Sequence, residues 1–102
     1  MKQTLVDDAH TLFVSPLSNK TRLAIILALQ KGPKNVTQIT EKLEVHQTTA
    51  SHSLRRLLDC GFVFVKRNGQ ERVYELNKKT IKPLLSLMTK HVAQYCTKRC
   101  RR

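Results

Sequence analysis

One stretch decides the fold of this chain: Gln47-Thr48-Thr49-Ala50-Ser51-His52-Ser53-Leu54-Arg55-Arg56-Leu57-Leu58. Its apolar residues recur at helical spacing and predict an amphipathic helix with one buried side. The first turn carries small hydroxyl and amide side chains, and two arginines follow on the exposed side. Such groups hydrogen-bond the base edges and phosphates of DNA. The pair Cys60-Gly61 predicts a left-handed cap at the end of this helix, before a strand.

Three further helices are predicted on the N-terminal side of this stretch. The first is short and ends at Ser15-Pro16, because the residue before a proline disfavours the helical conformation. The second runs from about Asn19 to Lys31, with Ser18 as its N-cap and Gly32-Pro33 as its stop. The third begins at Thr37, whose hydroxyl can cap it.

The residues after Gly61 change to the period of a β-hairpin. The run from Phe62 to Arg67 is β-branched and aromatic, Asn68-Gly69 predicts a tight turn, and Arg72 to Leu76 returns as the partner strand. A last helix is predicted from about Thr80 to Cys96 or beyond, with its apolar residues on one face. That face is long for a small domain, so it predicts half of a subunit interface.

Length and charge agree with a single nucleic-acid-binding domain over residues 1–102. The formal net charge of +12 at pH 7 favours a polyanionic partner, either nucleic acid or an anionic membrane surface. No hydrophobic run approaches the length of a membrane span, and the N-terminus lacks a signal-peptide core. We therefore expect a cytoplasmic protein with no membrane partner, whose three cysteines are thiols rather than disulfides.

Enzymatic chemistry has no support in the sequence. It contains no nucleophile–base pair, phosphate loop, carboxylate cluster or metal triad, so we expect no enzyme and no cofactor. A winged-helix module that binds protein or RNA is an alternative. RNA-binding sheets normally stack bases on aromatic side chains, and aromatic residues make up only 5% of this chain.

The order of helices, helix-turn-helix and basic hairpin predicts a winged helix-turn-helix: mainly α with a β-hairpin wing, in the order α-α-α-α-β-β-α. Three segments resemble motifs of ArsR/SmtB-type repressors: the opening at residues 17–26, the helix-turn-helix from Val36 through Leu54, and the wing at residues 67–76. The resemblance covers about residues 5 to 95. It implies a core and wing over 16–76 and dimerisation helices at 1–14 and 80–97.

The function that this resemblance implies is a homodimeric transcriptional repressor. Such a repressor binds an inverted-repeat operator in double-stranded DNA and leaves it when an inducer arrives. The sequence does not identify an inducer. It also leaves open which genes are regulated.

The resemblance assigns base reading to the first turn of the recognition helix, led by Gln47 and Thr48. Arg55 and Arg56 are expected to contact phosphates, and the wing can straddle the DNA backbone or enter the minor groove. The full set of predicted DNA-binding residues is Gln38, His46, Gln47, Thr48, Thr49, Ser51, His52, Arg55, Arg56, Lys66, Arg67, Asn68, Gly69, Gln70 and Arg72. Two positions depart from the family pattern, His46 (commonly Ser) and Ser53 (commonly His), so a weaker N-cap is expected. Glu71, an acidic residue within the basic wing, is expected to pair with a neighbouring arginine.

The predicted dimer interface lies on the terminal helices. Its residues are Leu5, Leu12, Leu84, Leu85, Met88, Val92 and Tyr95.

The metal sites that the resemblance implies are not matched by this sequence. The segment from Lys34 to Ile39, where the family can carry a Cys-x-Cys pair, has neither cysteine nor histidine. Of the four positions of the site on the C-terminal helices, which are Lys78, Thr80, His91 and Gln94, only His91 is a ligand type. We therefore predict no metal site.

A thiol-based signal remains as an alternative. Cys96 and Cys100 are four residues apart and share a helix face, and the basic residues around them favour the reactive thiolate. The two thiols could therefore serve a redox or thiophilic-metal sensor. The favoured interpretation is that Cys96 is a small interface hydrophobe and Cys100 an incidental tail thiol, because buried cysteine commonly behaves as a hydrophobic residue.

Overall fold

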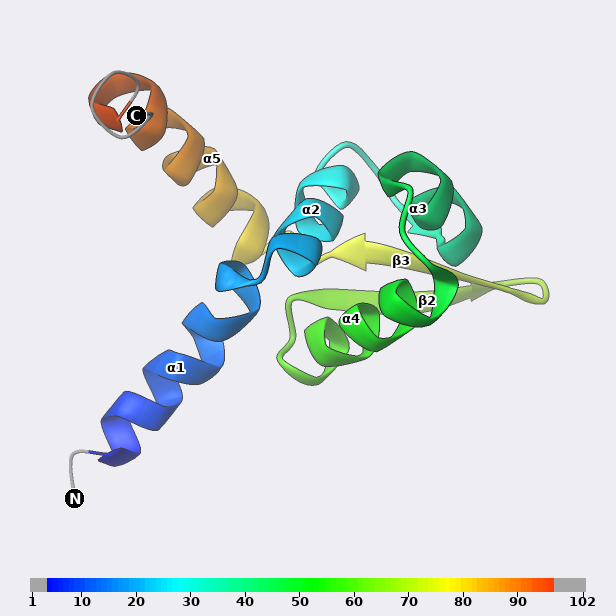
Figure 1. Ribbon diagram of the computed structural model, residues 1–102, viewed down its shortest axis with the longest axis horizontal. Helices are drawn as coiled ribbons and strands as arrows, with labels where there is room; N and C mark the ends of the chain where they lie inside the picture. The colour runs from blue at the N-terminus through cyan, green and yellow to red at the C-terminus, as the bar shows by residue number, and fades with distance from the viewer. Residues whose placement is uncertain (1–3, 97–102) are drawn as a thin grey trace.

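The computed structural model describes residues 4–96, and their side chains from His10 onward (Figure 1). Its elements run in the order α1 (Thr4–Ser18), α2 (Lys20–Leu29), β1 (Lys34–Asn35), α3 (Val36–Leu43), α4 (Gln47–Asp59), β2 (Val63–Asn68), β3 (Glu71–Leu76), α5 (Ile81–His91) and a π-helical turn η1 (Val92–Cys96). The winged helix-turn-helix predicted from the sequence is confirmed. Helices α3 and α4 form the helix-turn-helix, and strands β2 and β3 form the wing.

The sheet has one strand more than the predicted hairpin. Its order is β1-β3-β2, and both pairings are antiparallel. Strand β1 is only two residues long and pairs Lys34 with Tyr74 and Asn35 with Val73. Two residues are too short to show a strand period, so the sequence carries no signal for β1. Its effect is to join the start of α3 to the middle of the wing.

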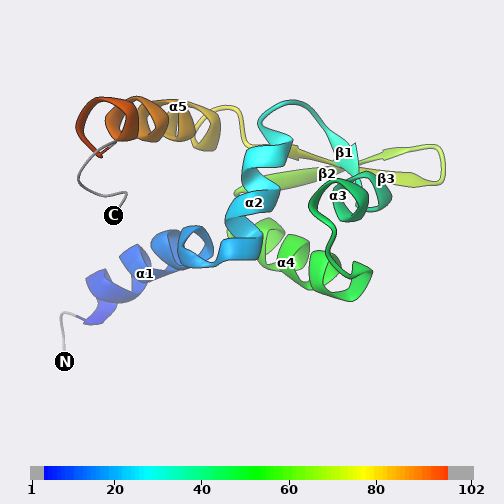
Figure 2. The ribbon, with the colours of Figure 1, turned by 45° about the horizontal axis from the view of Figure 1, so that its top comes forward.

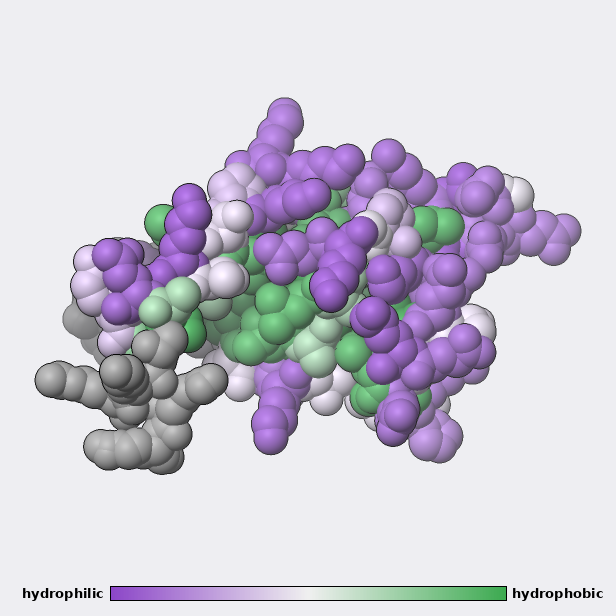
Figure 3. All heavy atoms as spheres, turned by 90° about the horizontal axis from the view of Figure 1, so that it is seen from above, coloured by the Kyte–Doolittle hydropathy of each residue, from purple (hydrophilic) through white to green (hydrophobic). Residues whose placement is uncertain are grey.

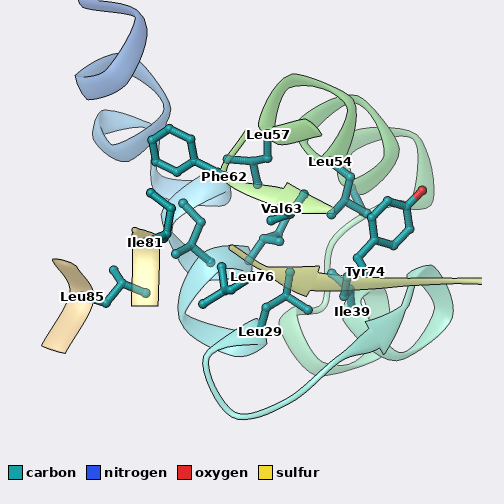
Figure 4. Close-up of a cluster of buried hydrophobic side chains, with 13 residues drawn as sticks. Leu29, Ile39, Leu54, Leu57, Phe62, Val63, Tyr74, Leu76, Ile81 and Leu85 are labelled. Carbon is teal, nitrogen blue, oxygen red and sulfur yellow. The ribbon is translucent and has the colours of Figure 1, made fainter. Parts of the chain in front are cut away.

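The core lies between the helices α2, α3 and α4 and the sheet (Figure 4). Figure 4 shows Leu54 and Leu57 of α4 pointing toward Val63 of β2, with Tyr74 of β3 beside Leu54. Ala50, Leu54 and Leu57 are at most 1% exposed, as the helical spacing predicts. Because this side of α4 is fixed in the core, its opposite side is held at the molecular surface.

The boundary between α1 and α2 differs from the prediction. Helix α1 does not end at Ser15-Pro16 but continues to Ser18, with Pro16 inside the helix and buried. The side chain of Ser18 donates to the carbonyl of Ser15 at 2.9 Å, so it bonds within α1 and does not cap α2. The cap of α2 is Asn19, whose side chain accepts from the Arg22 amide at 2.9 Å.

Two other helix caps show which sequence signals were competing. Helix α3 is capped by Asn35, which exchanges hydrogen bonds with Gln38 in a capping box, and the predicted cap Thr37 lies inside the helix. Helix α4 has His46 at its N-cap without a side-chain hydrogen bond, which confirms the weaker cap. Its end is also as predicted, because Gly61 follows with φ of 76°.

The wing turn is tight. Asn68 pairs with Glu71, so the loop consists of Gly69 and Gln70 alone, and Gly69 has φ of 72°. The tight turn predicted at Asn68-Gly69 is confirmed, with Asn68 as the last strand residue rather than a loop residue.

The terminal helices extend away from the core. Figures 1 and 2 show α1 and α5 projecting at the end of the molecule opposite to the wing tip. The segments His10–Ser18 and Lys20–Leu29 meet at 86°. Within residues 4–96, no helix is by itself both long and apolar enough to cross a membrane.

Candidate nucleic-acid interface

The exposed side of α4 carries seven of the predicted DNA-binding residues. All seven of them on this helix are exposed, namely Gln47, Thr48, Thr49, Ser51, His52, Arg55 and Arg56. The N-terminal turn presents amide and hydroxyl groups, while the arginines follow two turns later. This order is the one expected of a recognition helix, whose N-terminal residues face the base edges of the major groove. Arg55 also lies 3.7 Å from Asp59, whereas Arg56 has no ion pair among the described residues.

Two predicted contacts flank α4. His46 is exposed at its N-cap. Gln38 on α3 is exposed too, but its Oε1 accepts from the Asn35 amide at 2.8 Å. This capping bond leaves the side-chain NH₂ of Gln38 as the group available to a ligand.

The cations of the wing divide between its two faces. Arg67 lies directly opposite Arg72 across the hairpin, and both are exposed. Opposed like charges destabilise a strand pair, so an anion between them is favoured. Their neighbour Lys66 points to the other face of the sheet, because successive side chains alternate. There its Nζ lies 2.8 Å from Glu75 Oε2.

The pairing with Lys66 changes the acidity of Glu75. The hydrogen bond from Lys66 is the main cause that lowers the pKa of Glu75; desolvation of the carboxyl opposes the shift, and the charges of Lys66 and Lys78 add to the lowering. Lys66 is therefore neutralised within the chain. The opposed arginines, not this lysine, supply the uncompensated charge of the wing strands.

The tip completes the wing surface. Asn68, Gly69 and Gln70 are all exposed there. Together with the opposed arginines they form a narrow projection beyond the core (Figure 1). Its width suits contact with a groove edge or with the backbone of DNA.

One hydrogen bond connects the wing to the helix-turn-helix. Asn35 Nδ2 donates to Glu71 Oε2 at 2.6 Å, while Asn35 also caps α3. Glu71 does not form the expected pair with an arginine: no ion pair joins the two among the residues described. Sequence reasoning missed Asn35, because nothing near Glu71 in the chain indicates a partner from the strand β1.

Similarity to known proteins identifies the family. Residues 19–64 match the family described as bacterial regulatory protein, arsR family. The chain is 35% identical over 71 residues to the arsenical resistance operon repressor of Bacillus subtilis, covering 69% of this chain and 68% of that repressor. The chain belongs to the ArsR family.

A second sequence relative and a solved structure are also similar to this ArsR-family chain. It is 36% identical over 69 residues to the HTH-type transcriptional regulator NmtR of Mycobacterium tuberculosis, covering 68% of this chain and 58% of NmtR. A homodimeric winged helix-turn-helix DNA-binding domain from Mycobacterium bovis, solved by NMR, superposes with a TM-score of 0.79 at 26% identity, covering 92% of this chain and 86% of that one. The chain spans 58 to 64% of the length of three curated relatives that it matches.

The terminal helices of this ArsR-family chain leave apolar side chains exposed. Among the predicted interface residues, Leu12, Met88, Val92 and Tyr95 are exposed and Leu84 is half-buried. Leu85 differs: it is 1% exposed and packs in the core of its own chain, because it lies on the side of α5 that faces α2. The side chain of Leu5 lies outside the described residues.

An apolar groove of about 420 Å³ runs between α2 and α5. Leu23 and Leu27 of α2 form one wall, and Met88 and Val92 form part of the other. Figure 3 shows hydrophobic surface left uncovered between hydrophilic margins. The sequence prediction missed Leu27, which is 42% exposed, because its helical period is that of a core residue.

Of the two cysteines in the thiol alternative, one lies within the described residues. Cys96 is half-buried at the end of η1, and Cys100 lies outside the described residues. The ring of His91 lies 5.1 Å from that of Tyr95. Among the described residues of this chain, no group of three His, Cys, Asp or Glu side chains is placed to hold a metal ion.

Proposed function

We propose that this ArsR-family protein is a sequence-specific regulator of transcription, a homodimeric repressor that binds an inverted-repeat operator in double-stranded DNA in the cytoplasm. It is not proposed to be an enzyme. The observation that carries the proposal is the exposed side of α4, where amide and hydroxyl groups precede the arginines. The wing adds Arg67 opposite Arg72, and the net charge of +12 supplies long-range attraction to DNA.

The dimer part of the proposal rests on the terminal helices. The exposed apolar residues Leu27, Met88 and Val92 line a groove that can take the same elements of a second copy. Leu12 and Tyr95 add exposed apolar surface on α1 and η1. Two recognition helices related by a dyad read half-sites about 34 Å apart, or one turn of the double helix. An imperfect inverted repeat follows from that symmetry.

The test is a gel shift on the region upstream of the protein's own gene, with unlabelled specific and scrambled DNA as competitors. A sequence-specific repressor is displaced by the specific competitor at a concentration at least a thousandfold below that of scrambled DNA, roughly the usual lower limit of specificity. Equal displacement by both competitors at moderate salt contradicts the proposal. It would leave a nonspecific nucleic-acid binder or a protein-interaction module.

A further inference from the structure

A basic cleft lies between the first turn of α2 and the C-terminal half of α4, beside the reading surface. It has a volume of about 310 Å³. It is lined by Arg22, His52, Ser53, Arg55, Arg56 and Asp59. Three guanidinium groups therefore meet a single carboxylate, and that carboxylate lies beside Arg55 at 3.7 Å. The remaining charge at the cleft is positive.

Arg22 has donors that the chain does not satisfy. Its Nη2 lies 3.5 Å from the carbonyl of Ser15, at the long limit of a hydrogen bond. Its Nε is buried and has no hydrogen-bond partner among the described residues. Contacts within the chain therefore hold the guanidinium of Arg22 only weakly. Arg22 also lines the cleft, where its other donors can meet an acceptor from outside the chain. The planar guanidinium fork matches the oxygens of a phosphate.

The wall opposite Arg22 leaves room for such a group. Ser53 on α4 is only 7% exposed and lines the cleft. A larger side chain at this position, such as histidine, would occupy part of that volume. The short side chain of Ser53 keeps the space beside Arg22 open.

The place of the cleft on α4 indicates which phosphate it takes. Gln47 and Thr48 stand at the first turn of the helix, and the cleft begins at His52, more than one turn further along. A recognition helix reads bases with its first turn, so its later turns approach the sugar-phosphate strand at the groove edge.

We propose that the cleft between α2 and α4 binds one phosphodiester of the DNA backbone, with Arg22 as its central ligand and Arg56 beside it. This inference rests on the proposed function, since it requires α4 to lie in a DNA groove. It adds a contact from α2, an element outside the helix-turn-helix and the wing. It also gives Arg22, at the second helix, a role in affinity without a role in base reading.

The test uses Arg22→Gln, Arg22→Lys and the control Lys31→Gln, which removes a charge beyond the other end of α2. Affinities for operator-containing and scrambled DNA are measured by fluorescence anisotropy between 50 and 200 mM salt, after circular dichroism has established that each variant folds. Arg22→Gln should weaken binding to both DNAs by about tenfold for each chain bound, which corresponds to the loss of one charge-assisted hydrogen bond per chain. The salt slope should fall by about 0.9 for each chain bound, the value for one phosphate.

A scan with single methylphosphonates separates contact from a structural effect. Each phosphate of the operator is replaced in turn by this uncharged group. At one phosphate of each half-site, the methylphosphonate should weaken binding of the wild type but leave binding of Arg22→Gln unchanged. Arg22→Lys should retain the salt slope and keep only part of the affinity that this phosphate contributes. The proposed phosphate contact would be wrong if the effects of Arg22→Gln and of the methylphosphonate added up independently at every phosphate. It would also be wrong if Arg22→Gln left the salt slope unchanged.

Failure of the cleft and failure of the proposed function give different results. If the wild type binds its operator specifically but Arg22→Gln keeps the full salt slope, the cleft is wrong and the repressor remains. If the wild type shows no sequence preference, the repressor is wrong. The salt slope on scrambled DNA then still decides whether Arg22 binds a phosphate. Should Arg22→Gln not fold, the methylphosphonate scan with Arg22→Lys decides between contact and no contact.

Discussion

Single residues on α4 are proposed to have different roles in binding, base reading for Thr48 and phosphate contact for Arg56. Thr48 is exposed at the first turn, where its hydroxyl and methyl groups can meet base edges. Arg56 is exposed two turns later, without an ion pair in the described part of the chain. The two residues therefore predict opposite patterns of loss.

Thr48→Ala is expected to relax sequence preference. The operator should lose about 1–3 kcal/mol of discrimination against a changed base at one position, while binding to scrambled DNA stays the same. Competition gel shifts with single-base operator variants measure this. Equal weakening on operator and scrambled DNA would instead make Thr48 a backbone contact.

Arg56→Ala is expected to weaken binding to all DNA and to lower the salt slope by about 0.9 for each phosphate lost. The control is Arg55→Ala, which removes the same charge from a side chain that already lies near Asp59. Arg55→Ala should therefore change the salt slope less. A change of sequence preference alone in Arg56→Ala would exclude the phosphate contact.

Glu75 gives the chain a dependence on acid. Its pKa is lowered, first by the hydrogen bond from Lys66, so the ion pair stabilises the fold fully above the unfolded pKa of about 4.3. That stabilisation is lost as the pH falls through the lower pKa of the folded state. Glu75→Gln should thus have a lower melting temperature than the wild type at pH 7, and the difference should disappear in acid. A difference that stays constant from pH 7 down to pH 2 would show that packing, not charge, is responsible.

Elements of this fold were predictable where one strong signal acted alone. The helical period of Ala50, Leu54 and Leu57 predicted α4. Gly61 and Gly69 predicted the end of that helix and the wing turn, and both have a positive φ in the structure. Boundaries failed where two signals competed. Asn35 and Thr37 can both cap α3, and Asn35 prevails because Gln38 returns its hydrogen bond.

Contacts between distant segments were beyond what the sequence could predict. The bond from Asn35 to Glu71 spans 36 positions, and the basic cleft is lined by residues of both α2 and α4. Neither has a local pattern, since both depend on how the elements pack. The same holds for Leu85, whose apolar period fits a partner chain or its own core equally well.

The cap of α3 is expected to stabilise two elements at once. Asn35→Ala removes the capping box and the bond to the wing, so the free energy of unfolding should fall by about 1–2 kcal/mol. The matched control is Thr37→Ala, at the position that the sequence favoured as cap, which should change stability by less than about 0.5 kcal/mol. Urea titration measures both. The reverse order would restore Thr37 as the cap.

The whole molecule is expected to depend on pairing of its terminal helices. Val92 is 51% exposed at the edge of the apolar groove, so Val92→Asp should place a charge in the proposed interface. The control Ser86→Asp adds the same charge on an exposed part of α5 away from the groove. Sedimentation should find monomers for Val92→Asp and dimers for the wild type and Ser86→Asp. A dimeric Val92→Asp would remove this groove from the interface.

The right angle between α1 and α2 has a consequence for the range of expression over which such a protein works. Because α1 and α5 project away from the core, a single copy leaves the apolar side chains of these helices exposed. If two copies must meet before either binds an operator, occupancy rises with the square of the copy number while the protein is scarce. A promoter under such control would stay open during early accumulation and then close over a narrow window. The bend at Asn19 would thus help to set the number of molecules per cell below which the gene is only weakly repressed.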